Sequence, residues 1–462
     1  MHLSPRHVLQ VLERHPPSSR YWIAYSGGMD SRVLLHLCAR LARETALHFS
    51  AIHVHHGLQT LADEWVGHCR ITCEQEAIPC HILRVDARPV PGESPEEAAR
   101  KARYQALQSV MAAGDVLLTA QHRDDQAETL LLQLMRGCGL PGLAAMPEYA
   151  SLPPGFILRP LLTQSRDQLE TCAREGKLAW IEDPSNLDQG YDRNFLRHSV
   201  FPLLETRWPG LTTSLARTAR HCAEARDKLD ELTEVWLSQA LSGDVTRLDL
   251  TVLREHPPME RTMMLRGWLK RNGLRMIPTR QLDQLQTAVI QAAADRNPRL
   301  VWPDAEIRRY RHTLYLLIPP LKPIAPVRID WDGHSPLILP DDNGRLEVTR
   351  STGCGIALDQ WHKATLTVGY RQGGEKLCLP GRPVACELKK FLQEQGIPPW
   401  IRERLPLIYL DGQLASVAGR WTLAPYQARP EEASLGIDWK TVFWRFSLPG
   451  ESRVEHPPCE QD

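Results

Sequence analysis

The segment that most constrains this chain of 462 residues is a short glycine-containing stretch at residues 26–31. An apolar run at residues 21–25 precedes it, and residues 29–41 carry apolar side chains at helical spacing. Together they predict a buried strand, a tight turn at two adjacent glycines and a helix. The turn and the helix start would direct free N–H groups and the positive end of the helix dipole into one space. That arrangement suits a phosphate group, although an ordinary turn after a buried strand has the same pattern.

The sequence Ser-Gly-Gly-Met-Asp-Ser at residues 26–31 separates this stretch from two common phosphate-binding loops. It lacks the Gly-Lys-Ser/Thr ending of a Walker A loop and the G-x-G-x-x-G pattern of a dinucleotide-binding turn. It resembles the PP-loop of the N-type ATP pyrophosphatases, which cut ATP between its α and β phosphates and activate a carbonyl oxygen as an adenylate. The resemblance implies ATP as a cofactor. The ATP-binding residues that it implies are Ser26, Gly27, Gly28, Met29, Asp30, Ser31 and His53.

Length and composition bound the class of protein. A chain of this length exceeds one ordinary core, so we expect two or three domains. Basic and acidic residues number 55 each, so a nucleic-acid surface would have to be local. The start of the chain lacks the apolar core of a signal peptide, no apolar run is long enough to span a membrane, and the 11 cysteines show no C-x-x-C spacing. We therefore expect a cytoplasmic protein with reduced thiols, no membrane partner and no zinc site.

Strand-like and helix-like segments alternate through the first part of the chain. The later strands are expected at residues 47–55, 79–86 and 115–120. Such βαβ units predict a parallel sheet, and ligand sites in parallel sheets lie at the carboxyl ends of the strands. We therefore expect residues 26–31, 53–58 and 122–129 to lie on one rim of the sheet.

Acidic residues open the helix that is expected after the fourth strand. Asp125 and Glu128 stand three residues apart and can share one helix face near His122. Two carboxylates there can hold Mg²⁺ on ATP, or bind and deprotonate an amine, whereas taken alone they are explained by helix capping. Because the glycine-containing loop is expected on the same rim, we favour the functional interpretation. The candidate metal ligands are Asp30, Asp125 and Glu128.

Two pairs of arginines are candidates for binding phosphate or carboxylate groups. Arg100 and Arg103 lie within a helix expected over residues 94–113. Arg193 and Arg197 stand four residues apart at the start of another helix, so they share a face. A salt-bridged or solvated helix surface explains either pair equally well.

The remaining sequence indicates two further domains. One long helix is expected at residues 211–241, with helical segments to about residue 293 and strands within residues 300–317. A proline-rich stretch then precedes short strands, a helix at residues 387–395 and an Asp-Gly hairpin turn, which indicate a small α+β domain. The tail from about residue 450 is expected to be disordered. The expected domains are residues 1–212, 213–325 and 326–462.

Motifs along nearly the whole chain resemble those of the tRNA(Ile)-lysidine synthetase family. In the first half these motifs are residues 26–31, His55-His56-Gly57-Leu58, Glu97-x-x-Arg100-x-x-Arg103-Tyr104, Thr119-Ala120-x-His122 with residues 124–129, residues 136–143, Arg159-Pro160-Leu161-Leu162, and residues 182–186 with Arg193-Asn194-x-x-Arg197. In the last part they are Arg371-x-Gly373-Gly374-Glu375 and residues 388–391 with 398–400. His55 departs from the family, in which Asn or Asp is common at this position.

The resemblance implies a two-step reaction. The wobble cytidine of tRNA(Ile) with a CAU anticodon is adenylated by ATP at its 2-carbonyl oxygen, and pyrophosphate leaves. The ε-amino group of free lysine then displaces AMP, which yields lysidine and changes decoding from Met/AUG to Ile/AUA. The implied fold is an α/β, adenine-nucleotide-hydrolase-like PP-loop domain with a parallel sheet, then a mainly helical domain and a small α+β domain that hold the tRNA.

The resemblance also implies roles for individual residues and a requirement for Mg²⁺. The implied catalytic residues are Asp30, Asp125, Glu128, Arg193, Asn194 and Arg197. The implied substrate-binding residues are Arg100, Arg103, Tyr104, His122, Arg371, Lys389 and Lys390. The sequence leaves open which carboxylate binds Mg²⁺, which one serves lysine, and whether the protein forms a homodimer.

Three alternatives were weighed against this interpretation. A tRNA 2-thiolation enzyme of the same class usually needs paired cysteines or an iron–sulfur cluster, and C-x-x-C is absent. An enzyme that makes small-molecule amides usually carries a glutaminase, and no N-terminal nucleophilic cysteine is present. A non-catalytic RNA-binding protein on a degenerate PP-loop is disfavoured by the intact loop together with Asp125 and Glu128.

Overall fold

The computed structural model describes residues 3–55, 62–86, 88, 95–275, 277–293, 296–381 and 384–441. The chain divides into two units, residues 1–230 and 231–462. The division falls inside one long helix, α10 (Leu211–Ala240), which matches the helix expected at residues 211–241. The expected domain boundary at residues 212 and 213 lies at the start of this helix.

The first unit is built on a six-stranded sheet with the strand order β3-β2-β1-β4-β6-β5. Every neighbouring pair is parallel except β5 and β6. The parallel sheet confirms the fold class predicted from the alternation of strands and helices. The strands are β1 (Tyr21–Ala24), β2 (Phe49–His55), β3 (Cys80–Arg84), β4 (Val116–Leu118), β5 (Tyr149–Leu152) and β6 (Gly155–Leu158).

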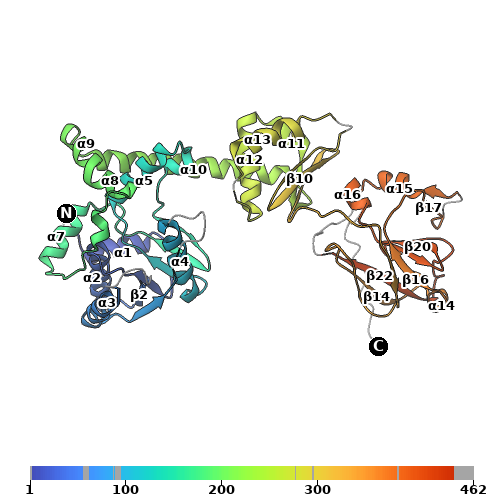
Figure 1. Ribbon diagram of the computed structural model, residues 1–462, viewed down its shortest axis with the longest axis horizontal. Helices are drawn as coiled ribbons and strands as arrows, with labels where there is room; N and C mark the ends of the chain where they lie inside the picture. Colours follow the sequence, from blue (N-terminus) through green and yellow to red (C-terminus); the bar gives the residue numbers. More distant parts are fainter. Residues whose placement is uncertain are drawn as a thin grey trace. The chain divides into compact units, whose positions relative to one another are not determined.

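Helices cover both faces of this sheet (Figure 1), as expected for strands whose side chains are apolar on both sides. Tyr21 and Ile23 of β1 belong to a core that includes residues of α1, α2, α3 and α7. Trp22, which points to the other face, packs in a second core with Leu107 and Met111. These helices are α1 (Pro5–Glu13), α2 (Met29–Glu44), α3 (Ala62–Glu76), α4 (Pro95–Val110) and α7 (Arg166–Glu175).

A small group of helices packs around α5, with Ala127, Leu196 and Phe201 at its centre. Figure 1 shows α8 and α9 beside α5 and the first part of α10. The helices are α5 (Arg123–Met135), α8 (Asp192–Phe195), the π-helical turn η2 (Leu196–Val200) and α9 (Phe201–Arg207). Between α5 and α8 the chain also forms α6 (Leu140–Leu143) and the 3-10 helix η1 (Pro184–Leu187).

The second unit begins with a five-stranded antiparallel sheet of order β7-β8-β11-β10-β9 and its helices. Strands β7 and β8 interrupt the run of helices expected after α10. The strands are β7 (Leu241–Ser242), β8 (Asp244–Asp249), β9 (Arg299–Trp302), β10 (Ala305–Tyr310) and β11 (Thr313–Leu317). The helical segments are α11 (Leu250–Glu255), α12 (Pro258–Arg271), α13 (Thr279–Gln284) and η3 (Leu285–Ile290).

The remaining described residues form the expected α+β part. Its strands are β12 (Arg328–Trp331), β13 (Leu337–Ile338), β14 (Arg345–Thr352), β15 (Ile356–Ala357), β16 (Leu366–Gly369), β17 (Lys376–Leu377), β18 (Cys386–Glu387), β19 (Leu407–Leu410), β20 (Gln413–Val417), β21 (Trp421–Thr422) and β22 (Ala433–Lys440). Its helices are α14 (Leu358–Lys363), α15 (Leu388–Glu394) and α16 (Pro399–Arg402). The hairpin predicted at Asp411-Gly412 is confirmed between β19 and β20. The tail predicted to be disordered lies outside the described residues.

None of the helices in the described part of the chain combines the length and the apolar character that a membrane crossing requires.

Candidate active site

The turn after β1 is shaped by Gly27. Its φ of +90° lies in the left-handed region, and a Cβ atom there would lie 2.7 Å from Ile181 Cδ1. Gly28 differs from the expectation that both glycines shape the turn, because it has a φ of −71° and caps α2 in an extended conformation. A Cβ atom on Gly28 would meet only Ser26 Oγ, at 3.5 Å. The backbone therefore requires glycine at Gly27 alone.

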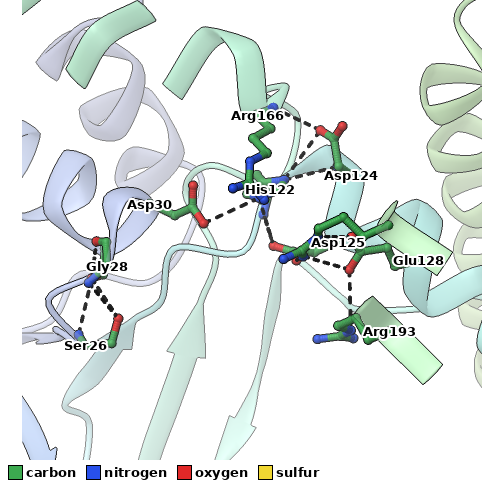
Figure 2. A network of polar contacts seen from close by, with 11 residues as sticks. Ser26, Gly28, Asp30, His122, Asp124, Asp125, Glu128, Arg166 and Arg193 are labelled. Atoms are coloured by element: carbon green, nitrogen blue, oxygen red, sulfur yellow. Dashed lines mark hydrogen bonds and ion pairs between the residues drawn. The ribbon is translucent and has the colours of Figure 1, made fainter. Parts of the chain in front are cut away.

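The loop is held by its own two serines and by a neighbouring segment. Ser31 Oγ donates a hydrogen bond to Gly28 O at 2.9 Å and lies 3.0 Å from Ser26 Oγ. The Gly28 N–H donates to Ser26 Oγ at 3.3 Å (Figure 2). The Ile181 N–H donates to Gly27 O at 2.9 Å. These bonds fix the loop at the carboxyl end of β1.

His122, which follows β4, is the centre of an acidic cluster (Figure 2). Its Nε2 lies 3.7 Å from Asp30 Oδ2 and 3.5 Å from Asp125 Oδ2, and its Nδ1 lies 3.5 Å from Asp124 Oδ2. Asp30 comes from the first turn of α2, so the structure confirms that the loop after β1 and the segment after β4 share one rim.

The His122 ring is buried, and burial opposes its protonation. The hydrogen bonds to Asp124 and Asp30 outweigh this effect and raise the pKa of His122 to about 10. Its Nδ1 accepts a hydrogen bond from the Asp124 N–H at 3.2 Å, which caps the first turn of α5, and its Nε2 faces Asp30 and Asp125.

Glu128 lies about one turn after Asp125 on α5 and forms ion pairs with two arginines. Arg197 donates from Nε to Glu128 Oε1 at 2.7 Å and from Nη2 to Oε2 at 3.0 Å. The same Nη2 lies 3.3 Å from Asp125 Oδ1, and Arg193 Nε lies 3.5 Å from Glu128 Oε2. The expectation that Arg193 and Arg197 share a face is therefore confirmed. Burial raises the pKa of Glu128 despite the hydrogen bonds from Arg197.

Comparisons with known proteins match three parts of the chain to known domains. The first unit matches the PP-loop domain over residues 2–204, and later parts match the TilS substrate binding domain over residues 248–315 and the TilS substrate C-terminal domain over residues 366–439. A tRNA(Ile)-lysidine synthase from Methylococcus capsulatus is 43% identical, covering 92% of this chain and 97% of its own length. The chain belongs to the tRNA(Ile)-lysidine synthase family. The relative from Coxiella burnetii is 40% identical, covering 94% of this chain and 96% of its own length.

Several residues that the family resemblance selected lie away from the acidic cluster. Asn194 donates from Nδ2 to the carbonyl oxygens of Ser185 and Asp188, both at 2.9 Å, so it braces the segment before α8. His53 is buried, and its Nδ1 lies 3.0 Å from Tyr25 O, beneath the loop. The catalytic and ATP-binding roles assigned to them stay predictions.

The other substrate-binding candidates are exposed or lie in the second unit. Arg100 and Arg103 are exposed on α4, and the Arg100 guanidinium lies 5.2 Å from the centre of the Tyr104 ring. Lys389 and Lys390 are exposed at the start of α15. Arg371 lies 3.7 Å from Glu375, between Nε and Oε2. The motif residues His56, Gly57 and Leu58 lie outside the described residues.

The carboxylates differ in their fitness as metal ligands for the family's reaction. Asp30 Oδ1 is buried and has no hydrogen-bond partner among the described residues, so it can accept a cation. Burial disfavours its charge, but the hydrogen bond and the charge of His122 lower the pKa of Asp30. Both oxygens of Glu128 are occupied by Arg197. Within the described residues, no three His, Cys, Asp or Glu side chains are gathered as a metal site, so shared ligation by Asp30, Asp125 and Glu128 stays a prediction.

The structure adds site residues that the sequence did not single out. Asp124 accepts a hydrogen bond from the Arg166 N–H at 2.9 Å, and Thr129 accepts one from Arg193 Nη2 at 3.0 Å. Asp124 lies within the acidic motif of residues 122–129, and this motif is the sequence signal that points to it. Nothing in the sequence distinguished Arg166 from other exposed arginines, because its position depends on how α7 packs near α5.

Proposed function

We propose that this chain modifies the wobble cytidine of tRNA(Ile) with a CAU anticodon to lysidine, using ATP and free lysine. It is a ligase that forms a C–N bond and releases AMP and diphosphate. The observation that carries the proposal is the meeting of Asp30, a residue of the PP-loop, with His122, Asp125 and Glu128 on one rim. One rim therefore offers groups for both ATP and an amine.

The first step is assigned to the loop and the start of α2. The first intrahelical hydrogen bond of α2 runs from the Arg32 N–H to Gly28 O, so the N–H groups of Met29, Asp30 and Ser31 precede it. Such groups, at the positive end of a helix dipole, bind phosphate. We assign them to the phosphates of ATP while the cytidine 2-oxygen attacks the α-phosphate and pyrophosphate leaves.

The second step is assigned to Asp125 and Glu128. The lysine ε-amine has a pKa of about 10.4 and is unreactive while protonated, so a carboxylate beside it must accept a proton. Glu128 fits this role because burial raises its pKa, which makes it a stronger base than an ordinary glutamate. Arg197 and Arg193 hold its carboxylate in place. The attack of the neutral amine on the adenylated C2 then expels AMP.

Mg²⁺ belongs to the proposal as well, with Asp30 as the ligand that the geometry favours and Asp125 as the next candidate. The ion would neutralise negative charge on the departing pyrophosphate. We assign Arg100, Arg103 and Tyr104, together with Arg371, Lys389 and Lys390 of the second unit, to tRNA. Because ATP, lysine and tRNA are reactants of the cytoplasm, we place the reaction there.

The test follows radiolabelled lysine into RNA. Purified protein, ATP and Mg²⁺ are mixed either with tRNA(Ile) that has a CAU anticodon or with elongator methionine tRNA as the matched control. The proposal expects ATP-dependent labelling of the isoleucine tRNA alone. Pyrophosphate release without labelling of either tRNA would point to another nucleophile and would contradict the assignment of lysine.

A further inference from the structure

Arg166 is the first residue of α7, and its side chain extends into the acidic cluster. Its backbone N–H donates to Asp124 Oδ2 at 2.9 Å. Figure 2 shows the side chain running from this point toward His122, in the space between Asp30 and Asp124. In this view the guanidinium lies on the side of His122 that faces Asp30.

Arg166 differs from the other cations of the site in having no fixed partner. His122 is surrounded by three carboxylates, and Arg197 and Arg193 contact Glu128. The Arg166 side chain is exposed, and its guanidinium makes no hydrogen bond or ion pair with any residue in the described part of the chain. A guanidinium that is positioned in a site and left without a partner is suited to an anion that arrives with the substrate.

We propose that Arg166 binds the phosphate oxygens of ATP from a position beside Asp30 of the PP-loop. This inference deepens the proposed function and depends on it. The anions available in the reaction are the triphosphate of ATP, the α-carboxylate of lysine and the phosphates of tRNA. Figure 2 shows the Arg166 side chain beside Asp30, a residue of the PP-loop, whereas Glu128 and Arg193 lie on the other side of His122 and Asp125. This position on the PP-loop side of the cluster favours the phosphates of ATP.

The position also suits the charge that develops in the first step. Cleavage between the α and β phosphates transfers negative charge to the departing pyrophosphate. An arginine beside Asp30 can stabilise that developing charge by donating two parallel N–H hydrogen bonds, which a lysine cannot do. Arg166 is therefore assigned as a catalytic residue for adenylation rather than for attack by lysine.

The test compares Arg166→Gln and Arg166→Lys with Arg174→Gln on the same helix. The hydrogen bond to Asp124 uses the backbone of Arg166, so these variants keep it and should fold as the wild type does. Arg174 serves as the matched control. It is exposed, it pairs with Glu170, and it lies about two turns after Arg166 on the same helix. Equilibrium binding of ATP with Mg²⁺ is measured first, without tRNA, and steady-state lysine incorporation into tRNA(Ile) second.

We expect Arg166→Gln to weaken ATP binding by about 10- to 100-fold, Arg166→Lys to recover part of the loss, and Arg174→Gln to match the wild type. The KM for lysine should stay unchanged. Unchanged ATP binding, or a raised KM for lysine with normal ATP binding, would overturn the proposal. The ATP-binding measurement contains no tRNA, so it gives a result even if the protein modifies no tRNA. A failure of this inference can therefore be distinguished from a failure of the proposed function.

Discussion

At the scale of single residues, the site depends on a few positions that tolerate little change. Gly27 is one, because its backbone is left-handed and Ile181 fills the space where a side chain would begin. Arg197 is another, because it binds both oxygens of the buried Glu128. Each of these residues shapes a different half of the rim, the first in the PP-loop and the second beside Glu128, the proposed base.

The two glycines of the loop make a matched pair for a stability measurement. Gly27→Ala places a Cβ atom at a φ of +90° and 2.7 Å from Ile181 Cδ1, whereas Gly28→Ala places one at a φ of −71° with an ordinary contact. We expect Gly27→Ala to lower the free energy of unfolding by about 1–3 kcal/mol. Gly28→Ala should change it by less than about 0.5 kcal/mol, the usual range for a site without strain. Urea denaturation measures the free energy of unfolding of both variants. Equal losses of stability in Gly27→Ala and Gly28→Ala would contradict this account of the turn.

At the residue scale, the sequence predicted which chemical groups lie on the rim better than it predicted which residues contact them. The residue types of the loop and of the acidic motif were sufficient to place Asp30, Asp125 and Glu128 on one rim. The partners of those residues were not predictable, because Arg166 and Ile181 reach the site through the packing of segments distant in sequence. Asn194 lies in a recognisable motif, yet its side chain bonds to two backbone carbonyls.

At the scale of elements, the helix after the PP-loop is braced by a buried ion network. Glu76, the last residue of α3, lies 2.9 Å from Arg32 Nη1 and 2.9 Å from His36 Nδ1, both on α2. Arg32 and Glu76 are both buried. Burial disfavours the charge of Glu76, but the hydrogen bonds from His36 and Arg32 lower its pKa. The network therefore holds α2, and with it the loop, against α3.

Glu76→Gln tests this brace and its pH dependence. Breaking a buried ion pair costs about 3–5 kcal/mol, so the variant should lose that much stability at pH 7. Because the folded pKa of Glu76 is lowered, its contribution is present above the unfolded pKa of 4.5 and is lost as the pH falls through the folded value. The difference in unfolding free energy between wild type and variant should therefore shrink as the pH falls below 4.5. A difference that does not depend on pH would count against the ionic brace.

Helices and strands were predicted correctly where the apolar pattern repeats over a long segment, and they were missed where the segment is short. The 30-residue helix α10 has a sustained helical pattern and was predicted almost to its ends. β7 and β8, with two and six residues, lie between helices and were missed, because so short a pattern competes with strong helical neighbours. The π-helical turn at Leu196–Val200, which carries Arg197, has no sequence pattern of its own.

At the scale of the whole molecule, the reaction needs a small-molecule site and a large RNA surface. The first unit contains the rim, and the second unit contains the exposed Lys389 and Lys390 of α15. The chain carries no net charge, so attraction for RNA has to come from such local groups rather than from an overall field. The family resemblance implied this division, whereas the extent of the two units had to come from the structure.

Lys389→Ala combined with Lys390→Ala tests the RNA assignment. Each phosphate contact that is lost weakens binding and lowers the slope of log affinity against log salt by about 0.7 to 0.9. We expect a higher KM for tRNA(Ile) and a smaller salt dependence, with ATP binding unchanged. Lys363→Ala on α14, an exposed lysine paired only with Asp359 at 3.8 Å, is the control. A salt dependence equal to that of the wild type would exclude both lysines from the RNA surface.

The most direct test of the central claim, that one rim carries ATP cleavage and then attack by lysine, is a single-turnover measurement on Glu128→Gln. The variant keeps the shape of the side chain and removes the proposed base. With tRNA(Ile), ATP and lysine, we expect pyrophosphate release to stay close to that of the wild type, while lysine incorporation slows by about 10²- to 10⁴-fold, the usual contribution of a general base. Equal slowing of both steps, or no slowing of either, would contradict the account.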